Sequence, residues 1–147
     1  MRADSWKIYW DEFAVNAYIY GSEINYIAKD NVEFVNDMMP PGTVINEWYS
    51  RTNFQSKKME PELPIIDGEG TYEVEVAMES DKPSGCLIRI VFLDKYDDEA
   101  GDVIVHERKA VFKCPLRTYS YKVQLISAGV SHLNFHYLII RELFDEH

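Results

Sequence analysis

The chain has 147 residues, of which 46% are hydrophobic and 14% aromatic. This size predicts one folded domain over residues 1–147, and the composition argues against disorder over most of its length. Lys and Arg total 15 against 25 Asp and Glu, so the formal net charge is −10. An acidic chain lacks the positive surface that binds nucleic acid or anionic lipid, and neither is expected as a partner.

Cysteine usage and the absence of targeting signals indicate a cytoplasmic protein. Cys86 and Cys114 fit two free core thiols better than a disulfide framework. The N-terminal residues MRADSWKIYWDEF lack the apolar segment of a secretory signal. No apolar run approaches the roughly 20 residues of a membrane-spanning helix. We therefore expect contact with a membrane only through partners.

The first half of the chain contains short apolar segments separated by turn-forming Gly, Pro, Asn and Asp residues, a pattern that predicts strands. These strands are expected at Trp6–Trp10, Asn16–Tyr20, Glu23–Ile27, Val32–Val35 and Val44–Tyr49. The strand-poor stretch Arg51–Gly70 follows them. A loop of that length is unusual inside a compact domain and is often functional.

Alternation of apolar and polar residues is clearer in the second half, where it predicts further strands. In Thr71–Glu79, one face carries Tyr72, Val74, Val76 and Met78. Cys86–Asp94 is nearly continuously apolar, which predicts a strand covered on both faces. Asp102–Phe112 has apolar ends and a charged middle, which predicts one long strand that bends or reaches an edge.

Two more strands and a C-terminal segment complete the pattern. Tyr119–Ile126 alternates regularly, and in Leu133–Ile139 one face is expected to carry Leu133, Phe135, Tyr137 and Ile139. Arg141–His147 has the composition of a short helix or a frayed tail. Many short strands without helical periodicity predict an all-β fold, a β-sandwich or jelly roll.

Groups suited to catalysis or to metal binding are sparse. His132 and His136 would lie about 13 Å apart on a strand, too far for one ion, so surface histidines are favoured. Asp94–Asp102 is acidic enough for a Ca²⁺ loop but fits a solvated turn better. Glu73 and Glu75 share a strand face, which an exposed surface explains without any reaction. We predict no catalytic residue, no metal and no cofactor.

The segment INEWYSRTNFQ (Ile45–Gln55) combines aromatic rings with amide and guanidinium donors. Such a surface suits a sugar, because a ring stacks on its C–H face while amides bond its hydroxyls. The alternative is that Trp48 packs in the core and the polar groups satisfy a long loop. The candidate ligand- or partner-binding residues are Trp48, Tyr49, Arg51, Asn53, Phe54 and Gln55.

Several motifs follow one another in a distinctive order. They are IYWDEF (Ile8–Phe13), YIYGSEINY (Tyr18–Tyr26), MMPPGT (Met38–Thr43), INEWYSRTNFQ, EPELPII (Glu60–Ile66) and LISAGVSHLNF (Leu125–Phe135). In this order they resemble the third member of the accessory Sec system proteins of Gram-positive bacteria, over roughly Ile8 to Ile140. Family members often have Tyr where this chain has Phe54, so one hydroxyl is missing here.

The resemblance implies a cytosolic, non-catalytic protein with a β-sandwich fold similar to carbohydrate-binding modules. It implies assembly with two companion accessory Sec proteins, one glycosyltransferase-like and one α/β-hydrolase-like. It also implies action with an accessory SecA-type motor ATPase at the membrane. The implied cargo is a serine-rich repeat glycoprotein adhesin, whose modification and secretion the complex assists.

The aromatic–amide segment has more than one possible use in such a complex. It suits weak contacts to carbohydrate or extended peptide, which gain avidity along a repetitive cargo, and an open strand edge suits β-augmentation. The same residues also suit a static interface with a companion protein. The expected function is therefore a binding and scaffold subunit, with a stand-alone carbohydrate-binding module as the alternative. A cupin-type enzyme would need a compact His/Glu metal set, which the sequence lacks.

Overall fold

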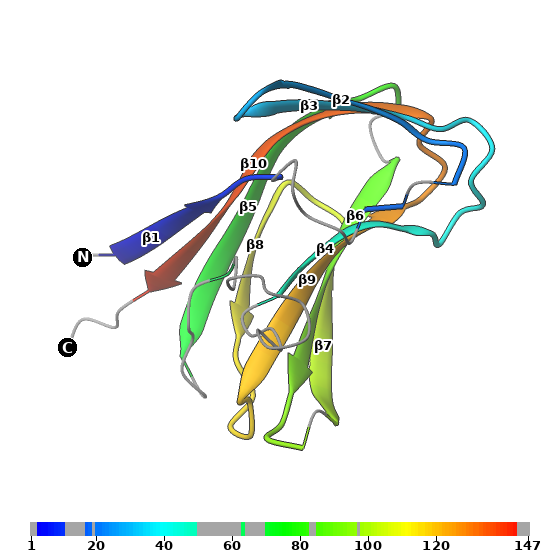
Figure 1. Cartoon of the computed structure of the whole chain (residues 1–147). Coiled ribbons are helices and arrows are strands. Elements are labelled where there is room, and N and C mark those ends of the chain that lie inside the picture. Colours follow the sequence, from blue (N-terminus) through cyan, green and yellow to red (C-terminus); the bar gives the residue numbers. More distant parts are fainter. Residues whose placement is uncertain are drawn as a thin grey trace, which may run out of the picture.

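The computed structural model describes residues 3–10, 17–18, 20–49, 63, 70–82, 85–96 and 98–143, which form two antiparallel β-sheets packed face to face (Figure 1). Within these residues, the first sheet runs in the order β2 (Glu23–Ala28), β3 (Asn31–Val35), β10 (His132–Leu143), β5 (Thr71–Ser80) and β8 (Lys109–Lys113), with β1 (Ala3–Ile8) paired to β10. The second sheet runs in the order β4 (Val44–Tyr49), β9 (Ser120–Ser127), β6 (Cys86–Leu93) and β7 (Glu99–Val105). The predicted all-β class is confirmed. None of the described residues belongs to a helix with the length and apolarity needed to span a bilayer.

Most predicted strands lie where the alternation placed them. The strands expected at Glu23–Ile27, Val32–Val35, Val44–Tyr49, Thr71–Glu79, Cys86–Asp94 and Tyr119–Ile126 are found to within one residue at each end. In β5, Tyr72, Val74 and Val76 point into the core while Glu73 and Glu75 point outward. In β6 only Val91 is buried among the outward-facing residues, so the outer face of that strand is less covered than expected.

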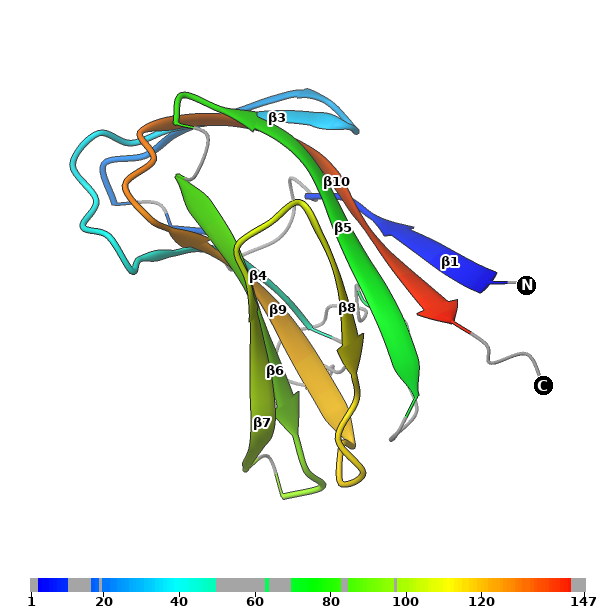
Figure 2. The same ribbon diagram turned by 180° about the vertical axis from the view of Figure 1, so that it is seen from behind.

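Strand β10 organises the first sheet. Its first part, His132–Phe135, pairs with β3, and its last part pairs with β1. On the other side it pairs with β5 along nearly its whole length. Figure 2 shows β10 lying between β5 and β1 from behind. Three neighbouring strands of this sheet therefore depend on one strand late in the chain.

A β-bulge in β10 changes which side chains face the core. The register with β5 shifts between Phe135 and Tyr137. Leu133 and Phe135 are buried before the bulge, whereas Leu138 and Ile140 are buried after it. The predicted common face of Leu133, Phe135, Tyr137 and Ile139 is therefore wrong for the last two residues, which are only half-buried. The extra residue reverses the alternation, because side chains in a strand repeat every two residues.

The segment Asp102–Phe112 forms two strands in different sheets, rather than the one long strand that was expected. Strand β7 ends at Val105 and β8 begins at Lys109. The carbonyl oxygen of Arg108 already accepts a hydrogen bond from the amide of Val76 in the other sheet, at 2.8 Å. The charged middle of the segment is thus the crossover between the sheets. His106, Glu107 and Arg108, which form this crossover, are exposed.

Three further predictions differ from the structure. The strand expected at Trp6–Trp10 begins earlier, at Ala3, and ends at Ile8, so Tyr9 and Trp10 lie beyond it. In Asn16–Tyr20 the described residues Ala17, Tyr18 and Tyr20 lie in a bend and a turn and not in a strand, and Gly21 follows with a positive φ of 74°. Glycine adopts this left-handed conformation without steric cost. In Arg141–His147, β10 continues to Leu143 in place of a short helix or frayed tail, and residues 144–147 lie outside the described part.

The core between the sheets is rich in aromatic rings. Trp48 from β4 stacks on Phe135 from β10 with ring centroids 5.2 Å apart, and Trp10 contacts the same cluster at 6.0 Å from Phe135. Phe112 from β8 contacts Phe92 from β6 at 5.9 Å. Ring contacts of this kind join the two sheets at two separate places in the sandwich.

Candidate interaction site

Strand β4 places the first predicted site residue, Trp48, inside the sandwich. Its side chain has no exposed surface, and its indole N–H donates a hydrogen bond of 3.0 Å to the carbonyl oxygen of Tyr9. This arrangement matches the core alternative of the sequence analysis. In the chain by itself, Trp48 therefore presents no ring to a sugar or a partner.

Tyr49 points to the outer face of the same strand and is half-buried. Its hydroxyl donates to one carboxylate oxygen of Glu47, and the side-chain amide of Gln124 donates to the other. The ammonium group of Lys122 lies 3.7 Å from the same carboxylate. Burial tends to raise the pKa of Glu47, but these hydrogen bonds and the lysine outweigh it, so the net shift is downward. The carboxylate stays ionised and holds Tyr49 in place.

The other predicted site residues, Arg51, Asn53, Phe54 and Gln55, lie outside the described residues. The nearest described residue beyond them is Leu63, whose amide donates to the carbonyl oxygen of Tyr49 at 3.1 Å. The Leu63 side chain is buried in the core. The chain after Arg51–Gln55 thus returns to the edge of β4, and the role of these four residues stays a prediction.

A polar and aromatic cluster at the β10 bulge was not predicted. His136 has its Nδ1 atom 2.7 Å from the carbonyl oxygen of Asp30 and its Nε2 atom against the Glu79 carboxylate. Two acceptors require both ring nitrogens to carry protons, and these contacts, the Glu79 hydrogen bond first, raise the pKa of His136. Beside it, the rings of Tyr9 and Tyr137 meet edge to face, 6.5 Å apart. The alternation of apolar and polar residues continues unbroken from Leu133 to Tyr137, so the sequence contains no sign of the bulge.

The two histidines considered as metal ligands have separate partners. His132 pairs with Glu33 at 2.9 Å, whereas His136 contacts Glu79. Hydrogen bonds from His132 and Asn25 lower the pKa of Glu33. In the part of the chain that the structure describes, no three His, Cys, Asp or Glu side chains are gathered as a metal site would require.

Five of the acidic side chains considered in the sequence analysis, Glu73, Glu75, Asp94, Glu99 and Asp102, have ordinary structural contacts. In the turn after β6, the Asp94 carboxylate accepts hydrogen bonds from the amides of Tyr96 and Asp98, and Glu99 and Asp102 form ion pairs with Arg89. On the outer face of β5, Glu73 and Glu75 each lie 2.8 Å from the guanidinium group of Arg141. These contacts explain the carboxylates as part of the fold.

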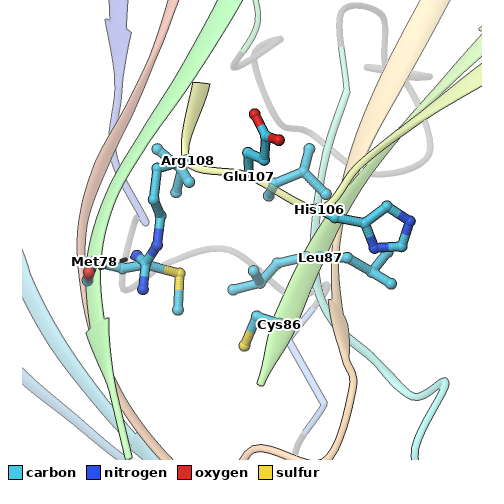
Figure 3. Close-up of a pocket in the computed structure, with 9 residues that line it drawn as sticks. Met78, Cys86, Leu87, His106, Glu107 and Arg108 are labelled. Carbon is cyan, nitrogen blue, oxygen red and sulfur yellow. Dashed lines mark hydrogen bonds between the residues drawn. The ribbon is translucent and has the colours of Figure 1, made fainter. Parts of the chain in front are cut away.

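A small pocket opens where the β7–β8 crossover passes between the sheets (Figure 3). Its walls include Met78, Cys86 and Arg108, and the guanidinium group of Arg108 donates to the carbonyl oxygen of Met78. The volume is about 20 Å³, enough for roughly one water molecule and far too small for a sugar ring. Burial raises the pKa of the Cys86 thiol to about 12, so this cysteine is a poor nucleophile. Both Cys86 and Cys114 are free.

Comparison with known proteins identifies the family. The family model described as accessory Sec secretory system ASP3 matches residues 17–142. This chain belongs to the accessory Sec ASP3 family. A curated relative from Streptococcus gordonii, which carries the same ASP3 name, is 34% identical over 95% of this chain and 94% of its own length.

Solved structures resemble the ASP3 chain described here along nearly its whole length. One is a chain of the crystal structure of accessory secretory proteins 1, 2 and 3 from Streptococcus pneumoniae, with a TM-score of 0.89 and 28% identity over 94% of this chain and 96% of that one. Another belongs to the glycosylation-associated Gap123 complex of Streptococcus agalactiae, with a TM-score of 0.89 and 32% identity over 97% of this chain. The match spans only 46% of that longer chain.

The ASP3 fold also resembles a carbohydrate-binding module. The tandem CBM22 domains of Paenibacillus barcinonensis Xyn10C match 99% of this chain and 48% of theirs, with a TM-score of 0.50 and 11% identity. At this identity the likeness concerns the fold alone. It confirms the expected similarity to a carbohydrate-binding module in architecture.

Proposed function

We propose that this chain is a non-catalytic binding and scaffold subunit of an accessory Sec export complex. Its direct partners would be two companion accessory Sec proteins, one glycosyltransferase-like and one α/β-hydrolase-like. The observation that supports this most strongly is the match, with a TM-score of 0.89, to a chain crystallised together with accessory secretory proteins 1 and 2. That match includes 94% of this chain and 96% of the other.

The wider role follows from the same family membership. The complex would act in the cytoplasm, at the membrane through an accessory SecA-type motor ATPase, on a serine-rich repeat glycoprotein cargo. The chain's net charge of −10 supports a membrane role through partners, because an acidic protein is repelled by anionic lipid.

The non-catalytic part of the proposal is supported by the chemistry of the described polar groups. The carboxylates of Glu47, Glu73 and Glu75 and the imidazole of His136 are held in ion pairs or hydrogen bonds on the outer faces of the sheets. The Cys86 thiol is deprotonated only at high pH. A subunit whose polar groups serve the fold is suited to holding partners.

The proposal is tested by reconstitution. The chain is co-expressed with its two companions from the same genome, and the mixture is analysed by size-exclusion chromatography with light scattering. We expect one stoichiometric complex, and we expect export of the cargo glycoprotein to fail when the gene is deleted and to recover on complementation. Separate elution of the folded chain, together with normal export in the deletion strain, would overturn the proposed function.

A second candidate function is binding of carbohydrate or extended peptide by the chain itself. It is supported by the half-exposed Tyr49 ring, which leads into Arg51, Asn53, Phe54 and Gln55. A ring next to amide and guanidinium donors suits a glycosylated, serine-rich cargo. Calorimetric titration with cargo glycopeptide and with the unglycosylated peptide tests it. We expect weak binding that Tyr49→Ala reduces and Tyr119→Ala, a change at an exposed tyrosine elsewhere, does not; no heat with either ligand would contradict it.

A further inference from the structure

Two loops at one end of the sandwich lie side by side, although they are separated in the sequence. They are the described part of 17–22, before β2, and 36–43, between β3 and β4, drawn in blue and cyan in Figure 1. The first loop overlaps the motif YIYGSEINY and the second overlaps MMPPGT, two of the motifs on which the family resemblance rests. None of the residues named in the candidate interaction site belongs to these two loops.

The buried side chain of Asn36 joins the two loops. Its amide nitrogen donates hydrogen bonds of 2.9 Å to the carbonyl oxygen of Tyr20 and to the hydroxyl oxygen of Ser22. Its amide oxygen accepts hydrogen bonds of 3.0 Å from the backbone amides of Met38 and Met39. The residue is only 2% exposed. Both functional atoms of this amide are therefore occupied, and they fix each loop relative to the other.

Further contacts hold the loops against the rest of the fold. The amide of Tyr18 donates to the carbonyl oxygen of Ile45 in β4 at 2.8 Å, and the amide of Gly42 donates to the carbonyl oxygen of Ser127 in β9 at 2.7 Å. The rings of Tyr18 and Tyr20 meet edge to face, 5.6 Å apart. The surface that the loops present is thus largely formed before any partner binds.

That surface is apolar and nearly uncharged, and we call it the apolar end surface: Tyr18, Tyr20, Met38, Met39, Pro40 and Pro41. Met38 is 85% exposed and Tyr20 is 76% exposed. Among the residues of both loops, Asp37 is the one charged residue, in a chain that is 27% charged. The loops at the other end of β9 also expose apolar side chains, but Lys95, Asp98 and Arg117 lie among them.

We propose that the apolar end surface docks onto a companion protein of the accessory Sec complex, against a patch that is apolar and neutral or weakly basic. The inference rests on the proposed function. Stable interfaces are depleted in charge and enriched in Tyr and Met at their centre, as this surface is. Because the chain carries a net charge of −10 and Asp37 lies within the surface, an acidic patch would be repelled. Loops that are already fixed lose little conformational entropy on binding.

The nature of the surface favours a folded protein over a sugar or a second copy of the chain. A sugar needs several side-chain donors and acceptors around a ring, whereas four of the six side chains here, those of Met38, Met39, Pro40 and Pro41, offer no donor. Self-association would place Asp37 of two acidic chains close together. A companion protein with a complementary apolar patch meets neither difficulty.

The test compares two double variants in binding to the purified companion proteins. Tyr20→Asp with Met38→Asp alters the apolar end surface, and Tyr96→Asp with Leu116→Asp is the matched control at the other end, where the two side chains are 71% and 69% exposed. All four positions are exposed, so both variants are expected to melt at the temperature of the unsubstituted chain. We expect the first variant to bind the companions at least tenfold more weakly and the control to bind within twofold of the unsubstituted chain.

The outcomes separate this inference from the function on which it rests. If the unsubstituted chain itself fails to bind the companions, the proposed function fails. If it binds and the folded Tyr20/Met38 variant binds equally well, the docking surface is wrong. Equal weakening of companion binding by both variants also overturns the proposed docking surface. So does a dimer of the chain, detected by sedimentation, that the Tyr20/Met38 change abolishes.

Asn36→Asp provides a second variant that changes none of the six side chains of the apolar end surface. The carboxylate still accepts from the amides of Met38 and Met39, but it donates nothing to Tyr20 or Ser22. The loop before β2 then loses its attachment, and we expect weaker companion binding at a temperature where circular dichroism shows the chain still folded. Binding equal to that of the unsubstituted chain would contradict the fixed arrangement of the loops.

Discussion

Trp48 is the residue on which the two interpretations of the aromatic–amide segment differ. Its indole lies in the core, stacks on Phe135 and donates a hydrogen bond to Tyr9. It therefore links β4 in one sheet with β10 in the other and with the chain just after β1. Its contribution is to hold the two sheets together.

We predict that Trp48→Ala lowers the free energy of unfolding by about 3–5 kcal/mol, because it leaves a large cavity between the sheets. Trp48→Phe retains a ring against Phe135 but leaves the carbonyl oxygen of Tyr9 without its donor, and it is expected to cost less. Urea denaturation measures both, with the exposed Tyr20→Ala as a control that should remain within about 0.5 kcal/mol of the unsubstituted chain. A Trp48→Ala chain of unchanged stability would contradict this core role.

The amino-acid sequence does not distinguish a core position from a surface position for Trp48, because the alternation of buried and exposed residues along β4 is interrupted. The register with β9 shifts between Val44 and Asn46, so Ile45, Asn46 and Trp48 are all buried. Tyr49 beside it points outward, and Arg51 and Asn53 lie outside the described part, so the contact role of these residues stays a prediction. Residue types alone identify the composition of a site, whereas burial depends on the register of the strand.

At the scale of the elements, strand positions were predictable and strand connections were not. Regular alternation located β5 and β9 to within one residue. It failed at Asp102–Phe112, where two strands of different sheets follow one another with only three residues between them. It also failed for the faces of β10, because a single inserted residue reverses the alternation. Crossovers and bulges depend on tertiary pairing, which a single sequence does not display.

The bulge in β10 gives this strand a pH-dependent contact. His136 contacts Glu79 and the carbonyl oxygen of Asp30, and its pKa is raised above the ordinary value of 6.5. A pKa that is higher in the folded chain means that the protonated histidine stabilises the fold. That contribution is fully present below pH 6.5 and is lost as the pH rises through the raised value.

We therefore predict that the melting temperature falls as the pH rises above 6.5 and that His136→Gln reduces this fall. His106→Gln, a change at an exposed histidine of the β7–β8 crossover, serves as the control and should leave the fall in place. Differential scanning calorimetry at a series of pH values provides the measurement. An identical pH dependence in the His136→Gln chain would show that the contact at the bulge does not contribute.

Across the whole molecule, the two sheets share one aromatic core, and charged side chains lie outside it. The large buried side chains come from both sheets and include Trp10, Trp48, Tyr72, Tyr121, Phe34, Phe92 and Phe135. The sandwich and its family could be predicted because strand alternation and the order of the motifs extend over most of the chain. The apolar end surface could not be predicted, since it arises only when Asn36 brings together two loops that are separate in the sequence.

The position of β10 in the chain has a consequence for synthesis. A ribosome releases β1, β3 and β5 long before β10, yet each of them pairs with β10 in the finished sheet. These strands therefore lack their common partner until β10 itself has been synthesised, with apolar surface exposed in the meantime. Ribosome-bound chains arrested before His132 should be cleaved readily by protease, and those in which a linker after His147 carries β10 clear of the ribosome should resist it. Equal resistance of both would mean that the first sheet forms without its central strand.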